Sequence, residues 1–94
     1  MNTDTHLTYT EDMGKLYEAI STLSSPDDCR AFFEDICSLK ELHAMAQRLH
    51  VAKMLNEGLS FNQISEKTGA STATISRVSR CLASGSGGYK KVFK

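Results

Sequence analysis

Apolar side chains recur every three or four residues along most of the chain, which is the spacing of helices that bury one face. The first such stretch extends from Tyr9 to Leu23. A second begins at Pro26, after a serine that can cap it, and extends to about Cys37. No stretch alternates apolar and polar positions in the manner of a strand. The pattern therefore predicts an all-α protein.

The longest predicted helix lies in the middle of the chain. Ser38 and Glu41 form an S-x-x-E capping box, so a helix is expected to begin at Leu39. It ends where Gly58 can adopt the left-handed conformation. Its apolar residues cover more than one side, and so wide an apolar surface on a small chain predicts a partner helix from a second copy.

The segment after this helix has the pattern of a helix-turn-helix. A second capping box, Ser60-Phe61-Asn62-Gln63, begins a short helix that must stop before the turn at Gly69-Ala70-Ser71. A last helix extends from Thr72 to about Ala83. Such a crossing needs a small residue, a turn glycine and an apolar inner face. These places are filled in order by Ser65, Gly69, Ile75 and Val78.

The outward positions of the last helix carry short or basic side chains, so the helix can lie deep in a major groove. These positions are Ser71, Thr72, Ala73, Ser76, Arg77 and Arg80. A helical hairpin inside a bundle can also have two short helices and a glycine turn. Four hydroxyl residues between Ser71 and Ser76, and the absence of acidic residues, are unusual for a packing helix. They favour DNA binding.

The charge distribution supports this interpretation, although the net charge of the 94 residues is zero. Residues 1–41 hold three basic and nine acidic side chains, a net charge of −6. Residues 42–94 hold eight basic and two acidic side chains, a net charge of +6. A one-sided positive field is expected of a surface that meets phosphates. The length predicts one domain, with dimerisation and core helices in 1–58, the helix-turn-helix in 60–83 and a flexible basic tail in 84–94.

Other chemistries find little support in the sequence. The three cysteines, Cys29, Cys37 and Cys81, form no C-x-x-C pair, and they are interpreted as small apolar residues of a cytoplasmic protein. No signal sequence or membrane-length apolar stretch is present, so no membrane partner is expected. His43 and His50 lack a third ligand at suitable spacing. We therefore expect no metal, no cofactor and no enzyme activity.

The residues of the turn and the last helix also resemble a known family. The segment Gly69-Ala70-Ser71-Thr72-Ala73-Thr74-Ile75-Ser76-Arg77 resembles the recognition segment of Trp repressors. The wider region is similar to the YerC/YecD group of Trp-repressor-related proteins, through Gln47-Arg48-Leu49, Gly58, the block from Glu66 to Leu82, and Gly87-Gly88-Tyr89. The resemblance implies an intertwined, all-helical homodimer that presents two recognition helices to successive major grooves. It also implies that the protein is a transcriptional regulator, and we expect it to act as a repressor.

The resemblance also implies roles for individual residues. Phe61 and Asn62 would meet the DNA backbone, Thr72, Ala73, Thr74 and Ser76 would face bases and phosphates, and Arg80 would lie one turn further on. Together with the outward Ser71 and Arg77, these form the predicted DNA-binding set: Phe61, Asn62, Ser71, Thr72, Ala73, Thr74, Ser76, Arg77 and Arg80.

The corepressor pocket of the family transfers poorly. Thr74 and Arg77 match pocket residues, but the pocket serine is Cys81, and Val78 and Gln47 replace a glycine and an arginine. Tryptophan is therefore not expected as corepressor. Two alternatives to a simple DNA-binding regulator remain open. One is a dimer that senses another small molecule at Thr74, Arg77 and Cys81, and the other is an all-α protein-interaction module that does not bind DNA.

Overall fold

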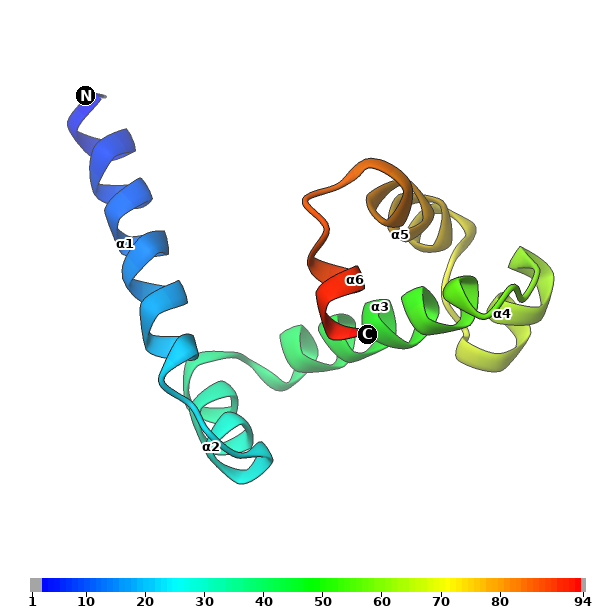
Figure 1. Cartoon of the computed structure of the whole chain (residues 1–94), viewed down its shortest axis with the longest axis horizontal. Helices are drawn as coiled ribbons and strands as arrows, with labels where there is room; N and C mark the ends of the chain where they lie inside the picture. The colour runs from blue at the N-terminus through cyan, green and yellow to red at the C-terminus, as the bar shows by residue number, and fades with distance from the viewer. Residues whose placement is uncertain (1–2, 94) are drawn as a thin grey trace. The chain divides into compact units, whose positions relative to one another are not determined.

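The computed structural model describes residues 3–93, and the side chains from Thr10 to Phe93. The described residues form helices and no strand, which confirms the all-α prediction (Figure 1). The helices are α1 (Thr3–Ser21), α2 (Pro26–Ile36), α3 (Leu39–Asn56), α4 (Phe61–Thr68), α5 (Thr72–Ser84) and α6 (Gly88–Val92). They divide into two units, one up to Ser38 and one from Leu39 onward.

In the first unit, α1 begins before the predicted start at Tyr9, because no proline or glycine interrupts the preceding residues. The side chain of Tyr9 lies outside the described residues. The helix ends at Ser21, before the predicted Leu23. The backbone N–H of Leu23 donates to the carbonyl of Ile20 at 3.1 Å, a three-residue spacing that tightens the last turn.

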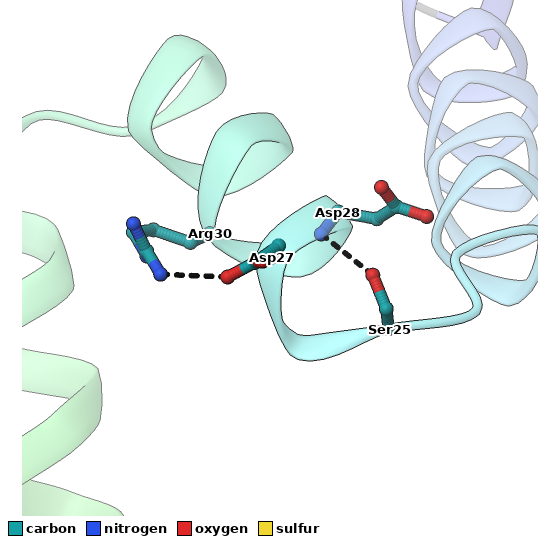
Figure 2. Close-up of polar contacts among 4 residues, drawn as sticks. All are labelled: Ser25, Asp27, Asp28 and Arg30. Carbon is teal, nitrogen blue, oxygen red and sulfur yellow. Dashed lines mark hydrogen bonds and ion pairs between the residues drawn. The ribbon is translucent and has the colours of Figure 1, made fainter.

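The helix α2 begins as the sequence predicts, with Ser25 as its cap and proline in its first turn. The Ser25 hydroxyl oxygen accepts a hydrogen bond from the backbone N–H of Asp28 at 3.1 Å (Figure 2). Arg30 pairs with Asp27 at 2.7 Å (Figure 2). Both of these side chains are mostly exposed, so this ion pair adds little stability. The structure buries no residue of α2.

The second unit contains the buried core. Its six buried apolar residues come from α3, α4, the turn and α5: Val51, Ala52, Ile64, Ala70, Ile75 and Val78. Figure 1 shows α4 following the C-terminal end of α3, and α5 lying beside α3. The sequence grouped residues 1–58 as dimerisation and core helices. In the structure, α3 packs on α4 and α5 of its own chain, because Val51 and Ala52 contribute to their core.

The end of the chain differs from the prediction of a flexible tail over residues 84–94. Residues Gly88–Val92 form the short helix α6. The rings of Tyr89 and Phe93 stack with centroids 6.2 Å apart, and both residues pack against the core of the second unit. Their four-residue spacing places them on one face of a helical turn, so both can reach the apolar core. Lys94, part of the predicted tail, lies outside the described residues.

Candidate nucleic-acid interface

The helix-turn-helix predicted from the sequence is formed by α4, the turn 69–71 and α5, which we call the reading head. Its first helix starts with a complete capping box. The Ser60 hydroxyl oxygen accepts from the backbone N–H of Gln63 at 3.1 Å, and the Gln63 side chain accepts from the backbone N–H of Ser60 at 2.8 Å. The capping box therefore satisfies two backbone donors at the start of α4.

The turn depends on a left-handed glycine. Gly69 has φ 74° and ψ 5°, and its N–H donates to the carbonyl of Ser65 at 2.8 Å. Behind the turn, Ala70 is only 3% exposed. The sequence assigned the small residue of the crossing to Ser65. Ser65 is exposed, and the buried small residue of this region is Ala70. The Ser65 hydroxyl donates instead to the carbonyl of Ala70 at 3.3 Å.

The second helix of the reading head is capped by Ser71. Its hydroxyl oxygen accepts from the backbone N–H of Thr74 and donates to the hydroxyl of Thr74, each at 3.1 Å. Ile75 and Val78 are each 1% exposed and hold α5 on the core. The side of α5 opposite these two residues is therefore the side available to a partner.

The predicted DNA-binding residues lie at the starts of α4 and α5 and along the first three turns of α5. Phe61 and Asn62 are exposed in the first turn of α4. Ser71, Thr72, Ala73, Arg77 and Arg80 are also exposed. Two members of the predicted set are less accessible than the others: Thr74 and Ser76 are half-buried, and the Thr74 hydroxyl accepts a hydrogen bond from Ser71. The reading head thus presents hydroxyl, methyl and guanidinium groups together.

The charge around the reading head is positive. The unit from Leu39 onward holds nine basic and three acidic side chains, and the preceding residues hold two basic and eight acidic ones. The structural boundary after Ser38 therefore also separates net charges of −6 and +6, because Lys40 and Glu41 cancel. The last acidic residue is Glu66 in α4, and Arg77 and Arg80 on α5 are exposed. Phosphates would meet a positive surface there.

The candidate ligand residues are not gathered in an enclosed pocket. Arg77 and Cys81 line a surface hollow of about 400 Å³ that is otherwise formed by Arg80, Ser84 and Gly85. Thr74 does not line this hollow. Cys81 is exposed, so the interpretation of this cysteine as an apolar filler is wrong, whereas Cys29 and Cys37 are half-buried. Val78, which stands where the family pocket is expected to have a glycine, is buried in the core.

A contact that the sequence did not indicate joins α3 to the reading head. The Nε2 of Gln47 donates to the carbonyl oxygen of Thr68, the last residue of α4, at 3.2 Å. No sequence pattern reveals such a bond, because its acceptor is a backbone atom 21 positions away. Within residues 3–93, no helix has the length and apolar composition needed to span a bilayer. Among the described side chains, from Thr10 to Phe93, no cluster of three or more His, Cys, Asp or Glu could hold a metal.

The chain is similar to known proteins in both sequence and structure. The sequence profile of the Trp repressor protein family matches residues 11–94. The uncharacterized protein YerC of Bacillus subtilis (strain 168) is 45% identical over 80 residues, which cover 85% of this chain and 77% of that protein. The crystal structure of a TrpR-like protein from Eubacterium eligens ATCC 27750 superposes with a TM-score of 0.83 at 48% identity. That match covers 88% of this chain and 86% of the other.

Proposed function

The chain belongs to the Trp repressor protein family, and from this premise we propose that it regulates transcription by binding double-stranded DNA through its reading head. The resemblance favours repression. The similar proteins are bacterial, so we propose that this action takes place in the cytoplasm, and the proposal includes no catalytic step.

The observation that carries the proposal is the contrast between the two sides of α5. One side is buried through Ile75 and Val78, each 1% exposed. The other exposes Thr72, Arg77 and Arg80 without an acidic neighbour on the same helix. Guanidinium groups can bind guanine edges or phosphates, and methyl groups of threonine or alanine can contact thymine methyls. A helix that served only to pack would have no need of this combination.

Selection of bound genomic fragments, followed by fluorescence anisotropy on the enriched sequence, tests the proposal. Thr72→Ala combined with Arg80→Ala should weaken binding, because a good base contact contributes about 1–3 kcal/mol of discrimination. Affinity should also fall steeply with salt, since phosphate contacts release counterions. Arg30→Ala is the charge-matched control, because Arg30 is exposed in the other unit. Equal binding by the double variant and the control would refute the assignment of α5.

The active form we propose is a homodimer. The first unit has no buried residue among its described side chains, although its helices carry large apolar ones. Tyr17 is 59% exposed and Ile36 is 52% exposed. A second copy would remove such surface from water. Sedimentation equilibrium should give twice the mass of one chain, and the selected DNA should contain two half-sites about 34–36 Å apart. A monomeric mass at the concentration that binds DNA would overturn the dimer.

A metabolite-sensing dimer is the second candidate, and the hollow beside Arg77 and Cys81 is the observation that favours it. Two observations count against a ligand site: Val78 is buried, and the Thr74 hydroxyl already accepts a hydrogen bond from Ser71. A thermal-shift screen of amino acids, including tryptophan, distinguishes the two. A ligand present at 100 times its Kd should stabilise the protein by about 2.7 kcal/mol. No shift with any amino acid would exclude these ligands.

The third candidate is a protein-interaction module that does not bind DNA, for which the acidic first unit would be the docking surface. The same fragment selection tests it. A folded dimer that enriches no genomic fragment at low salt would favour this candidate over the regulator. Enrichment of one sequence would favour the regulator.

A further inference from the structure

The bond between Gln47 and Thr68 connects the long helix to the part of the reading head that determines where α5 begins. Gln47 and Thr68 are both half-buried, so water competes less for their polar groups than at an exposed site. The carbonyl of Thr68 is among the last four of α4, which have no partner within the helix. Gln47 supplies that missing partner from α3.

Thr68 transmits this connection to the turn. Its Oγ1 donates to the carbonyl of Ile64 at 2.7 Å and accepts from the backbone N–H of Ala70 at 3.1 Å. The Ser65 hydroxyl donates to the carbonyl of Ala70 at 3.3 Å. Ala70 directly precedes Ser71, the cap of α5. A continuous series of hydrogen bonds therefore extends from α3, through the end of α4, to Ala70, the residue before the cap of α5.

The apolar core alone does not define the angle between α3 and the reading head. Burial of Ile64, Ile75 and Val78 brings the helices together, but the hydrophobic effect has no preferred direction. A hydrogen bond has a preferred distance and angle. The Gln47 amide therefore restricts small rotations of α4 on α3 that the core would allow. Since α5 follows α4 after only three residues, such rotations would also move its DNA-facing side chains.

We propose that Gln47 is a positioning residue for DNA recognition. Its bond to Thr68 holds the reading head at the angle that DNA requires, so the orientation of α5 is maintained by groups of the chain itself and needs no bound effector. This inference rests on the proposed DNA-binding function. It concerns the angle of the reading head and not a direct contact between Gln47 and DNA.

The test compares Gln47→Met with the wild-type chain. Methionine keeps a similar length but has no amide donor. Affinity for the selected DNA site should fall about fivefold for each reading head, the change that accompanies the loss of one net hydrogen bond. Affinity for a random duplex of equal length, and the dependence of that affinity on salt, should not change, because phosphate contacts tolerate small changes of angle. The measured quantity is the ratio of specific to random affinity.

Two further variants separate positioning from a general loss of stability. Thr68→Val keeps the shape of the side chain and removes the hydroxyl that connects Ile64 and Ala70, and it should lower the same ratio. Thr22→Val is the matched control, because the Thr22 hydroxyl also donates to a backbone carbonyl at 2.7 Å, but at the end of α1. The control should leave the ratio unchanged. Circular dichroism verifies that each variant is folded at the assay temperature.

The results distinguish this inference from the proposed function. If the wild-type protein prefers no DNA sequence, the proposed function fails. If the wild-type protein is selective and both Gln47→Met and Thr68→Val keep its ratio while melting at lower temperature, Gln47 stabilises the fold only and the inference is wrong. An equal loss of specific and random affinity in both variants would also overturn it. A reduced ratio in both variants, with the control unchanged, supports it.

Discussion

Val78 provides the sharpest test of how α5 is held, because it is one of the two residues of this helix that are buried in the core. Val78→Ala removes two methyl groups from a side chain that is 1% exposed. Their transfer from water contributes about 1.6 kcal/mol, and an unrelaxed cavity adds up to about 1 kcal/mol. The higher helix propensity of alanine returns about 0.5 kcal/mol. We expect a net loss of about 2 kcal/mol.

Urea denaturation followed by circular dichroism measures this loss. Val92→Ala is the matched control, because Val92 is 68% exposed and the same atoms are removed. The control should change the free energy of unfolding by less than about 0.5 kcal/mol. Both variants should be measured at two protein concentrations, since dimerisation makes stability depend on concentration. Equal effects of the two substitutions, or a loss below about 0.5 kcal/mol for Val78→Ala, would refute the assignment of Val78 to the core.

Three smaller predictions concern the helix ends. Gly69→Ala should destabilise the protein by about 1–2 kcal/mol in the same assay, because φ is 74° and the added methyl meets open space, so the backbone alone carries the cost; no effect would show that the turn relaxes. Ser60→Ala should cost about 1 kcal/mol through the lost cap of α4, and an unchanged denaturation midpoint would contradict the capping box. Arg30→Ala should change the free energy of unfolding by less than about 0.5 kcal/mol, since its ion pair with Asp27 is exposed. A larger loss would mean that this ion pair is not exposed to water in solution.

Local signals predicted most of the helix boundaries. The helix starts at Pro26, Phe61 and Thr72 follow from capping serines, whose hydroxyls accept backbone N–H groups in the structure. The turn at Gly69 follows from the left-handed conformation that glycine accepts most readily. Such features depend on residues within three or four positions of each other, so the sequence alone can reveal them.

Features that depend on distant residues could not be predicted. The Gln47 bond joins a side chain to a backbone carbonyl, and backbone carbonyls are present at every residue. The helix α6 was missed because its lysines suggested a solvated tail, whereas the stacking of Tyr89 on Phe93 and their contact with the core favour an ordered turn. Ala70 was missed as the buried small residue because the fold, and not its own type, determines which small side chain is covered.

The separation of charge has opposite consequences for the two proposed associations. DNA binding would use the unit with net charge +6, so added salt should weaken it. A dimer formed through the first units would bring together two surfaces of net charge −6, which repel each other. Added salt screens this repulsion and should strengthen the dimer. Between about 50 and 200 mM salt, dimer dissociation should decrease while DNA affinity falls. If both associations weakened in parallel, the dimer would not be formed by the acidic units.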